Sequence, residues 1–409
     1  MGRKRLNSEQ NQKRLERPEL SVDFLSMRFG IYILGAGFSQ PAGLPIANDL
    51  WREIMRRGLT LTGRAGYFRD DLETYIKYRK NCDGIDLSPD KVKLEEFLAF
   101  LDIEHYLGLR GSHTWNSHGN EAQLVVKTLI GEILTESMPS KDRIPEIYLQ
   151  FAKILKPNDL VLTFNYDILL ERALEVAGVR YRLFPLRHRV DPEIPGRLAV
   201  DEKDEVIVFK LHGSIDWFDR SDYAWLEEER IRQGYGLGTP DLIFQGPEDF
   251  GAVPLLEGPH DPEDPLHHIY RIRDIERLYR RGILLRSTPS LLNPSSIKIL
   301  YSKMMRDFWW GLGQKGVLSF GMAVIGFSLS KQDEYARQVI YGLVKNYQTT
   351  YWEKNPFDHK KSPLVLVDLK KSPTEKQEFR HRYAFVDWNR AETHFDGFDK
   401  EAIELLSRG

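Results

Sequence analysis

The chain has 409 residues, a length that allows two or three domains and a full hydrophobic core. With 41% apolar residues, 29% charged residues and a net charge of −2, it has the composition of an ordinary globular protein, which argues against a dedicated nucleic-acid coat. The single cysteine, Cys82, excludes a disulfide framework and a zinc site built from Cys-x-x-Cys pairs.

The first 28 residues are basic and lack the apolar centre of a signal peptide. We expect them to form a mobile arm, or else a helix that docks on a partner subunit. No apolar run in the chain reaches the ~20 residues that cross a bilayer. These features predict a cytoplasmic protein that does not associate with membranes.

From residue 29 to residue 409 the sequence alternates short apolar runs with helical patterns. The runs are nearly continuous in apolar residues, which is typical of strands that are buried on both faces of a parallel sheet. This alternation predicts an α/β fold with a Rossmann-like parallel sheet. The expected strands are Ile31–Leu34, Leu160–Phe164, Val206–Leu211, Leu318–Ile325 and Leu364–Asp368.

Two long inserts interrupt the expected sheet. Residues from about 50 to 155 are mostly helical by pattern, with the clearest periodicity in Leu94–Leu109 and Glu121–Met138. Residues from about 218 to 300 are rich in Pro, Gly and charge, and we expect loops there. Within this second insert, His267–Arg286 has a basic helical pattern that either binds an acidic surface or nucleic acid, or is a solvated helix face.

Four polar segments follow expected strands, and this edge is where open α/β sheets bind ligands. They are GAGFS after the first strand, TFNYD after the second, KLHGS after the third and GFSLSKQD after the fourth. A single sheet would bring Gly35, Asn165, His212 and Gly326 to one rim. GLGQKG at 311–316 matches the spelling of a dinucleotide fingerprint, but it precedes a strand instead of following one, so we expect a connecting turn.

The order GAG-x-S, T-x-N-x-D, HG and G-x-S resembles the sirtuins, and is most similar to the sirtuin-like proteins of bacterial anti-phage defence systems. The resemblance covers about 29–49, 160–216 and 301–368, and it implies a pocket for NAD. Two departures weaken the protein-deacylase interpretation. One cysteine cannot build the zinc module of the deacylases, so no zinc is expected, and LPIANDL (44–50) replaces their Asp-Phe-Arg.

The resemblance implies that NAD is the substrate and that Asn165 and His212 are the catalytic pair. An amide can hold a ribose hydroxyl or a water, and an imidazole can take a proton near neutral pH. Asp167 either orients the loop or contacts the ribose, or it caps the helix that follows.

The same resemblance assigns the remaining wall of the pocket. Gly35, Ala36 and Gly37 are expected to present backbone N–H groups to the pyrophosphate, and Ser39 to add a hydroxyl or cap a helix. Gly326 and Ser328 are expected at the adenosine. Asp333 is either a ribose ligand or, as we favour, a helix cap. Asp368 either accepts from adenosine hydroxyls or is an exposed strand end.

These expectations predict an NAD glycohydrolase that releases nicotinamide and ADP-ribose and depletes NAD as a defence effector. By resemblance, a homo-oligomer and a HerA-type hexameric ATPase partner are expected, and because the chain has no G-x-x-x-x-G-K-[ST], any ATPase step must come from that partner. The alternatives are an NAD-dependent protein deacylase or ADP-ribosyltransferase, and a non-catalytic module that binds NAD or ADP-ribose.

Overall fold

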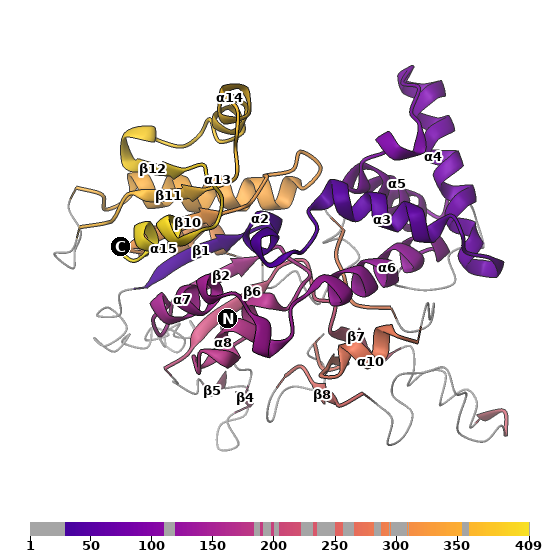
Figure 1. Ribbon diagram of the computed structural model, residues 1–409, viewed down its shortest axis with the longest axis horizontal. Helices are drawn as coiled ribbons and strands as arrows, with labels where there is room; N and C mark the ends of the chain where they lie inside the picture. Colours follow the sequence, from indigo (N-terminus) through magenta and orange to yellow (C-terminus); the bar gives the residue numbers. More distant parts are fainter. Residues whose placement is uncertain are drawn as a thin grey trace, which may run out of the picture.

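The helices and strands of the computed structural model run from Gly30 to Leu406 (Figure 1). The residues that the structure describes are 29–109, 119–183, 189–190, 198–199, 204–221, 232–234, 250–256, 266–281, 288–293, 295, 309, 311–353 and 360–408. The expected arm, residues 1–28, lies outside them.

A seven-stranded sheet forms the centre of the molecule, and all of its strand pairs are parallel. Its order is β12-β11-β10-β1-β2-β6-β3, so β1 lies in the middle, with Ile31 opposite both Met322 and Leu160. The predicted α/β fold is therefore confirmed. The strands are β1 (Gly30–Leu34), β2 (Leu160–Thr163), β3 (Tyr181–Arg182), β6 (Val206–Lys210), β10 (Gly321–Ile325), β11 (Leu364–Val367) and β12 (Ala391–His394).

Side chains of the central strands alternate between two hydrophobic cores. In β1, Ile31 and Ile33 belong to one core and Leu34 belongs to the other, and all three are fully buried. Successive side chains of a strand point to opposite faces, so an apolar run without alternation fills both cores at once. The strands thus read as continuous apolar runs because helices cover both faces of the sheet.

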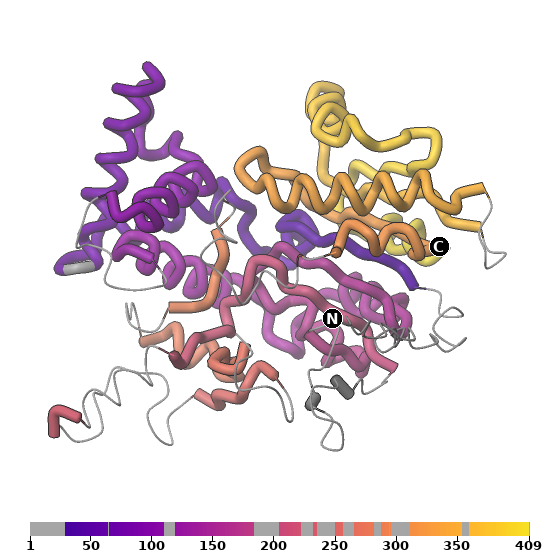
Figure 2. Tube along the Cα trace, turned by 180° about the vertical axis from the view of Figure 1, so that it is seen from behind, coloured from indigo at the N-terminus to yellow at the C-terminus, as the bar shows by residue number. Residues whose placement is uncertain are grey.

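One face of the sheet is covered by α7 (Glu146–Ile154), α8 (Leu169–Val176) and α15 (Lys400–Leu406). The opposite face is covered by α13 (Glu334–Thr349) and α14 (Pro373–Arg382). Figures 1 and 2 show the resulting three layers from the front and from behind.

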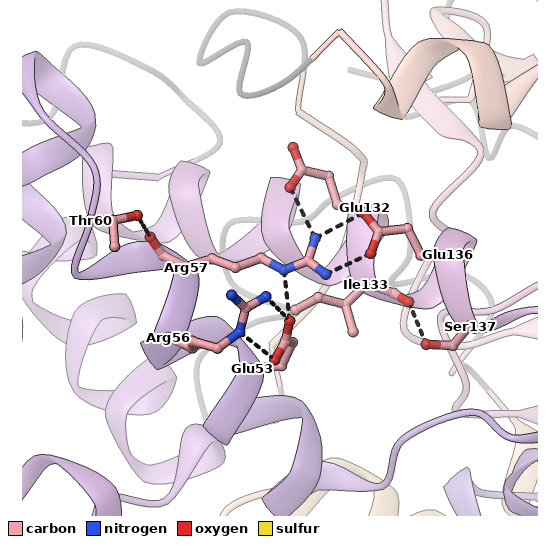
Figure 3. Close-up of polar contacts among 8 residues, drawn as sticks. All are labelled: Glu53, Arg56, Arg57, Thr60, Glu132, Ile133, Glu136 and Ser137. Carbon is pink, nitrogen blue, oxygen red and sulfur yellow. Dashed lines mark hydrogen bonds and ion pairs between the residues drawn. The ribbon is translucent and has the colours of Figure 1, made fainter.

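The interval between β1 and α7 contains a group of helices that stands beside the sheet where β1 ends (Figures 1 and 2). We call it the helical group, and α6 is so deeply buried within it that even Lys127 is only 5% exposed. A network of ion pairs joins α3 to α6 (Figure 3). In it, Arg57 of α3 contacts Glu53 of the same helix at 3.0 Å, and Glu136 and Glu132 of α6 at 2.6 Å and 3.6 Å. The members are α3 (Ala47–Gly58), α4 (Tyr67–Asp83), α5 (Leu94–Tyr106) and α6 (Glu121–Ser137).

The described part of the second insert contains more regular structure than we expected from its sequence. β7 (Trp217–Asp219), β9 (Ile269–Ile272) and β8 (Ala252–Pro254) form a small antiparallel sheet. The helix expected over His267–Arg286 is therefore wrong at Ile269–Ile272, and within 267–281, the described part of that stretch, α10 (Ile275–Tyr279) is the helical segment. Ile269 and Ile272 are buried in that sheet, and this tertiary burial overrides the helical spacing.

Other boundaries differ in detail from the prediction. The expected strand Leu318–Ile325 begins at Gly321, because η6 (Leu312–Val317), a 3₁₀ turn, occupies GLGQKG and ends just before it. GLGQKG is thus a connection, as predicted. β3 and β12, both at the sheet edges, were not predicted, since each is short or polar. The domain division at about 50–155 and 218–300 stays a prediction.

Candidate active site

A cavity of about 540 Å³ opens at the carboxyl ends of β1, β2, β6, β10 and β11. Its volume lies in the range of small-ligand sites. All of the site residues that the sequence predicts line it, together with Asp333. They are Asn165, His212, Gly35, Ala36, Gly37, Ser39, Asp167, Gly326, Ser328 and Asp368. The structure thus brings the predicted residues together in one cavity.

The glycines of the first turn serve close packing. Gly35 donates its N–H to the carbonyl of Ile325, and Gly37 donates to that of Gly326, both at 2.9 Å. A Cβ on Gly35 would lie 2.6 Å from the Gly326 carbonyl oxygen, and one on Gly37 would lie 2.7 Å from Gly326 Cα. The expectation that both N–H groups face a pyrophosphate is therefore wrong for this structure, because the end of β10 already accepts them.

Asn165 is held so that one atom remains for a ligand. Its Nδ2 donates to the carbonyl of Gly35 at 2.9 Å and to Ser39 Oγ at 3.1 Å. Because a carbonyl can only accept, this partner fixes the orientation of the amide. Both amide hydrogens are used, so Oδ1 is the atom left to contact a ligand. The amide that we expected to hold a ribose hydroxyl or a water can therefore do so through Oδ1, as an acceptor.

Ser39 and Asp167 form a chain of hydrogen bonds behind the Asn165 amide. Ser39 is 1% exposed, hydrogen-bonds to Asp167 as well, and makes no side-chain capping bond to the 3₁₀ helix that follows it. Asp167 accepts from the N–H of Leu169, the first residue of α8, at 3.1 Å, so it contacts the start of this helix, whose N-cap position is occupied by Ile168. Burial raises the pKa of Asp167, and the charge of Lys210 opposes that shift.

Lys210 forms a buried ion pair beneath the same loop. Its Nζ lies 2.8 Å from Glu171 Oε1 and donates to the carbonyl of Asp167 at 2.6 Å. Both side chains are almost fully buried, at 1% and 2% exposed. The sequence placed Lys210 in the KLHGS segment, but its partner on α8 follows only from the packing of the helix on the sheet.

His212 is paired with Asp333. His212 Nε2 lies 2.7 Å from Asp333 Oδ2, and both side chains are buried. The other oxygen of Asp333 accepts from the N–H of Ala336 at 3.1 Å, so Asp333 is also the N-cap of α13. The favoured capping role is confirmed, while the pairing with His212 was missed because 121 residues separate the two.

The glycine that follows His212 is required by its surroundings. Gly213 has a φ of +77°, and a Cβ on it would lie 1.9 Å from the carbonyl oxygen of Ser290. Aromatic rings enclose the imidazole, with Phe164 edge-on at 5.1 Å and Trp309 at 6.4 Å between ring centroids. The His-Gly pair therefore turns sharply beneath residues 290–292 and keeps the ring in one position.

The rim around Gly326 carries charged side chains. Arg382 donates to the carbonyl of Ser328 at 3.1 Å, and Asp368 lies 3.0 Å from Lys370 Nζ. Ser328 is exposed. Asp368 therefore lies at the cavity wall directly after β11, with the Lys370 ammonium beside it.

The helical group contributes a wall that the sequence argument did not include. Lys93, Leu94, Glu95 and Leu98 of the α5 region line the cavity. The Ser330 hydroxyl donates to Glu95 Oε2, which links α5 to the loop after β10. Only the tertiary fold could identify this wall, because the local sequence does not show that Glu95, and not its neighbour Glu96, faces the cavity.

Within the described ranges, we find no group of three His, Cys, Asp or Glu side chains arranged to hold a metal ion. In the same part of the chain, no helix combines the length and the apolar character needed to traverse a membrane.

Comparison with known proteins adds a family match for part of the chain. Residues 159–239 match the model of a SIR2-like domain. This segment includes Asn165 and His212. A search of curated proteins gave no match.

Among solved structures, the chain is similar to a sirtuin from work on sirtuin substrate affinity, at 13% identity and a TM-score of 0.29, covering 95% of this chain and 98% of that one. Sir2Tm bound to a propionylated peptide is 13% identical with a TM-score of 0.30, and the match covers 95% of this chain and 94% of that one. Sir2 with a p53 peptide and NAD+ is 13% identical with a TM-score of 0.29, and the match covers 95% of this chain and 94% of that one. Similarity at this level carries no information on activity.

Proposed function

We propose that this protein hydrolyses NAD to nicotinamide and ADP-ribose. The observation that carries the proposal is that Asn165 and His212 meet in one cavity, inside the segment that matches a SIR2-like domain. Cleavage of the nicotinamide–ribose bond creates positive charge on the ribose, and the leaving group departs as a neutral molecule without needing an acid. A site that offers acceptors suits this reaction.

The cavity supplies such acceptors. Asn165 presents only Oδ1, and His212 is bonded to the carboxylate of Asp333. In the tautomer that donates Nε2–H to Asp333, the basic nitrogen of His212 is Nδ1. We propose that Asn165 holds the ribose and that His212 accepts a proton during the reaction.

The other end of the dinucleotide would lie along the glycine turn and the ends of β10 and β11. Of the three residues in the first turn, Ala36 is the one whose N–H is not donated to the end of β10. We propose that Ala36 faces the pyrophosphate, that Gly35 and Gly37 shape the turn, and that Gly326, Ser328 and Asp368 contact the adenosine.

An assay with purified full chain tests the proposal and its alternatives. The chain is incubated with NAD, with and without an acyl-lysine peptide, and nicotinamide and ADP-ribose are quantified. Release without peptide supports hydrolysis, and turnover only with peptide supports a deacylase or ADP-ribosyltransferase. NAD binding without turnover supports a non-catalytic module. Hydrolysis that survives in Asn165→Ala or His212→Ala would show that the site is assigned to the wrong residues.

We further propose, from the sequence resemblance, that NAD loss serves anti-phage defence and that the chain assembles with itself and with a HerA-type ATPase. Phage plating on cells that carry the wild type or Asn165→Ala tests the first idea. Light scattering of the purified chain, alone and with the ATPase, tests the second. Equal phage plating efficiency on the wild-type and Asn165→Ala strains would contradict the defence role. A monomeric mass of the chain, both alone and with the ATPase, would contradict the assembly.

A further inference from the structure

Two adjacent glutamates begin α5, and only one of them reaches the cavity. Glu95 lines the cavity with Asn165 and His212, although it belongs to the helical group. Glu96 does not line it, and pairs instead with Arg79 at 2.8 Å and with Lys93 at 3.1 Å. The chain therefore offers a matched pair of acids on one helical turn.

One oxygen of Glu95 is anchored and the other is available. Oε2 accepts from the Ser330 hydroxyl. For Oε1, no hydrogen-bond partner occurs among the residues that the structure describes. An anchored carboxylate with one open oxygen at a cavity wall can take a proton from a molecule in that cavity.

The titratable groups around Glu95 belong to three elements. Asp333 faces it from the loop after β10, Tyr166 from the loop after β2, and Lys93 and Glu96 from its own turn. Burial, and then the charge of Asp333, raise the pKa of Glu95, while the Ser330 hydrogen bond and Lys93 oppose the rise. A carboxylate with a raised pKa is a better proton acceptor near neutral pH than an exposed one.

Hydrolysis of NAD needs such an acceptor. The bond between the ribose carbon and the nicotinamide nitrogen breaks, and its electron pair leaves with nicotinamide. The oxygen of a water bonds to that carbon and must lose one proton. We assign the proton that His212 Nδ1 accepts to a ribose hydroxyl, while His212 Nε2 faces Asp333. An amide such as Asn165 does not take protons at neutral pH, so the attacking water needs a base of its own.

Resting on the proposed NAD hydrolysis, we propose that Glu95 is a further catalytic residue, which contacts the attacking water and receives its proton. In this role the ionised carboxylate is the active form. The rate therefore falls as the pH drops through the pKa of Glu95.

Isosteric replacement tests this role. Glu95→Gln keeps the shape and an oxygen for Ser330, but it cannot take the proton. We expect kcat for NAD to fall about 100-fold or more, KM to change less than about 3-fold, and the acidic limb of the kcat profile to disappear. Sodium azide provides a second readout, because it attacks as an anion and has no proton to lose. Azide should restore turnover of Glu95→Gln and yield ADP-ribosyl azide.

Two further variants separate catalysis from structure. Glu96→Gln removes the neighbouring acid outside the cavity, and we expect wild-type kcat and an intact acidic limb. Ser330→Ala removes the anchor of Glu95, and we expect a loss below about 10-fold with the acidic limb retained. If Ser330→Ala matches Glu95→Gln, or if azide gives no rescue, Glu95 has only a structural role.

The outcome also separates this proposal from the proposed function. Wild-type release of nicotinamide with unchanged kcat in Glu95→Gln would overturn the role of Glu95 and leave NAD hydrolysis in place. A wild type that releases no nicotinamide would overturn both.

Discussion

At the scale of single residues, the candidate site depends on how each polar side chain is already occupied. Asn165 and Ser39 use their hydrogen-bonding groups on each other and on the backbone, so Asn165 has only Oδ1 for a ligand. His212 is similarly constrained by Asp333. The chemistry open to the site follows from the atoms that remain.

Replacement of Asp333 by Asn tests the pairing with His212. Asn keeps an oxygen that can cap α13 at Ala336, but it removes the carboxylate beside His212 Nε2. Because the imidazole loses the acceptor that fixes its tautomer, we expect kcat for nicotinamide release to fall about 100-fold, with little change in thermal stability. Asp333→Ala loses the cap as well and should melt at a lower temperature. An unchanged kcat in Asp333→Asn would show that the pairing is not needed for turnover.

At the scale of elements, two close contacts hold the site together. The turn between β1 and α2 (Ala36–Ser39) packs directly on the end of β10, and α8 packs on β6 through an ion pair. Each contact fixes a segment that carries a predicted site residue.

The first contact predicts an unequal response of two glycines. Gly326 has a φ of +60°, and a Cβ on it would lie 2.3 Å from the Phe38 nitrogen, so Gly326→Ala should lower the free energy of unfolding by about 3 kcal/mol. Gly43 has a φ of +91° but open space around it, so Gly43→Ala should cost only about 1 kcal/mol. Urea unfolding measures both, and equal losses would contradict the packing argument.

The second contact predicts the effect of breaking the Lys210–Glu171 pair. Lys210→Met leaves the Glu171 carboxylate buried without its cation, and we expect the free energy of unfolding to fall by about 3–5 kcal/mol. The double variant Lys210→Met/Glu171→Leu removes both charges and should recover most of that loss. If the double variant is no more stable than Lys210→Met, the buried charge is not the cause.

At the scale of the whole molecule, a buried polar cluster joins the helical group to the segment beside His212. Asp102 of α5 accepts from Gln123 of α6 at 2.6 Å and from Asn293 at 2.7 Å. The neighbouring residue Leu292 donates its N–H to the carbonyl of His212 at 2.8 Å. The helical group is thus tied to the sheet at the site, and its stability affects the cavity.

Burial of Lys127 makes the free energy of unfolding depend on pH. Burial lowers the pKa of Lys127 to about 8, while Asp102 opposes the shift. The unfolded chain binds a proton more tightly than the folded chain above pH 8, so the free energy of unfolding should rise from pH 8 to pH 10, by about 2 kcal/mol for this lysine. Urea unfolding across that range measures the slope. Lys127→Met should reduce the slope, whereas Lys91→Met, at an exposed position, should not.

Much of the fold could be read from the sequence because it depends on local patterns. Continuous apolar runs identified β1, β2, β6, β10 and β11, and helical periodicity identified α5 and α6. The misses share one cause. β9 carries a helical spacing and β12 is polar, and both become strands through their neighbours.

The sequence by itself determined which polar segments follow strands, and therefore that Gly35, Asn165, His212 and Gly326 share one rim, because parallel strands end at one edge of a sheet. Tertiary structure alone decided which atoms at that rim are free. The N–H groups of Gly35 and Gly37 donate to the carbonyls of Ile325 and Gly326. His212 is paired with Asp333, 121 positions away, and Glu95 of the helical group lines the cavity. Local spacing fixes the order of side chains along a strand, whereas contacts between distant segments depend on how the layers pack.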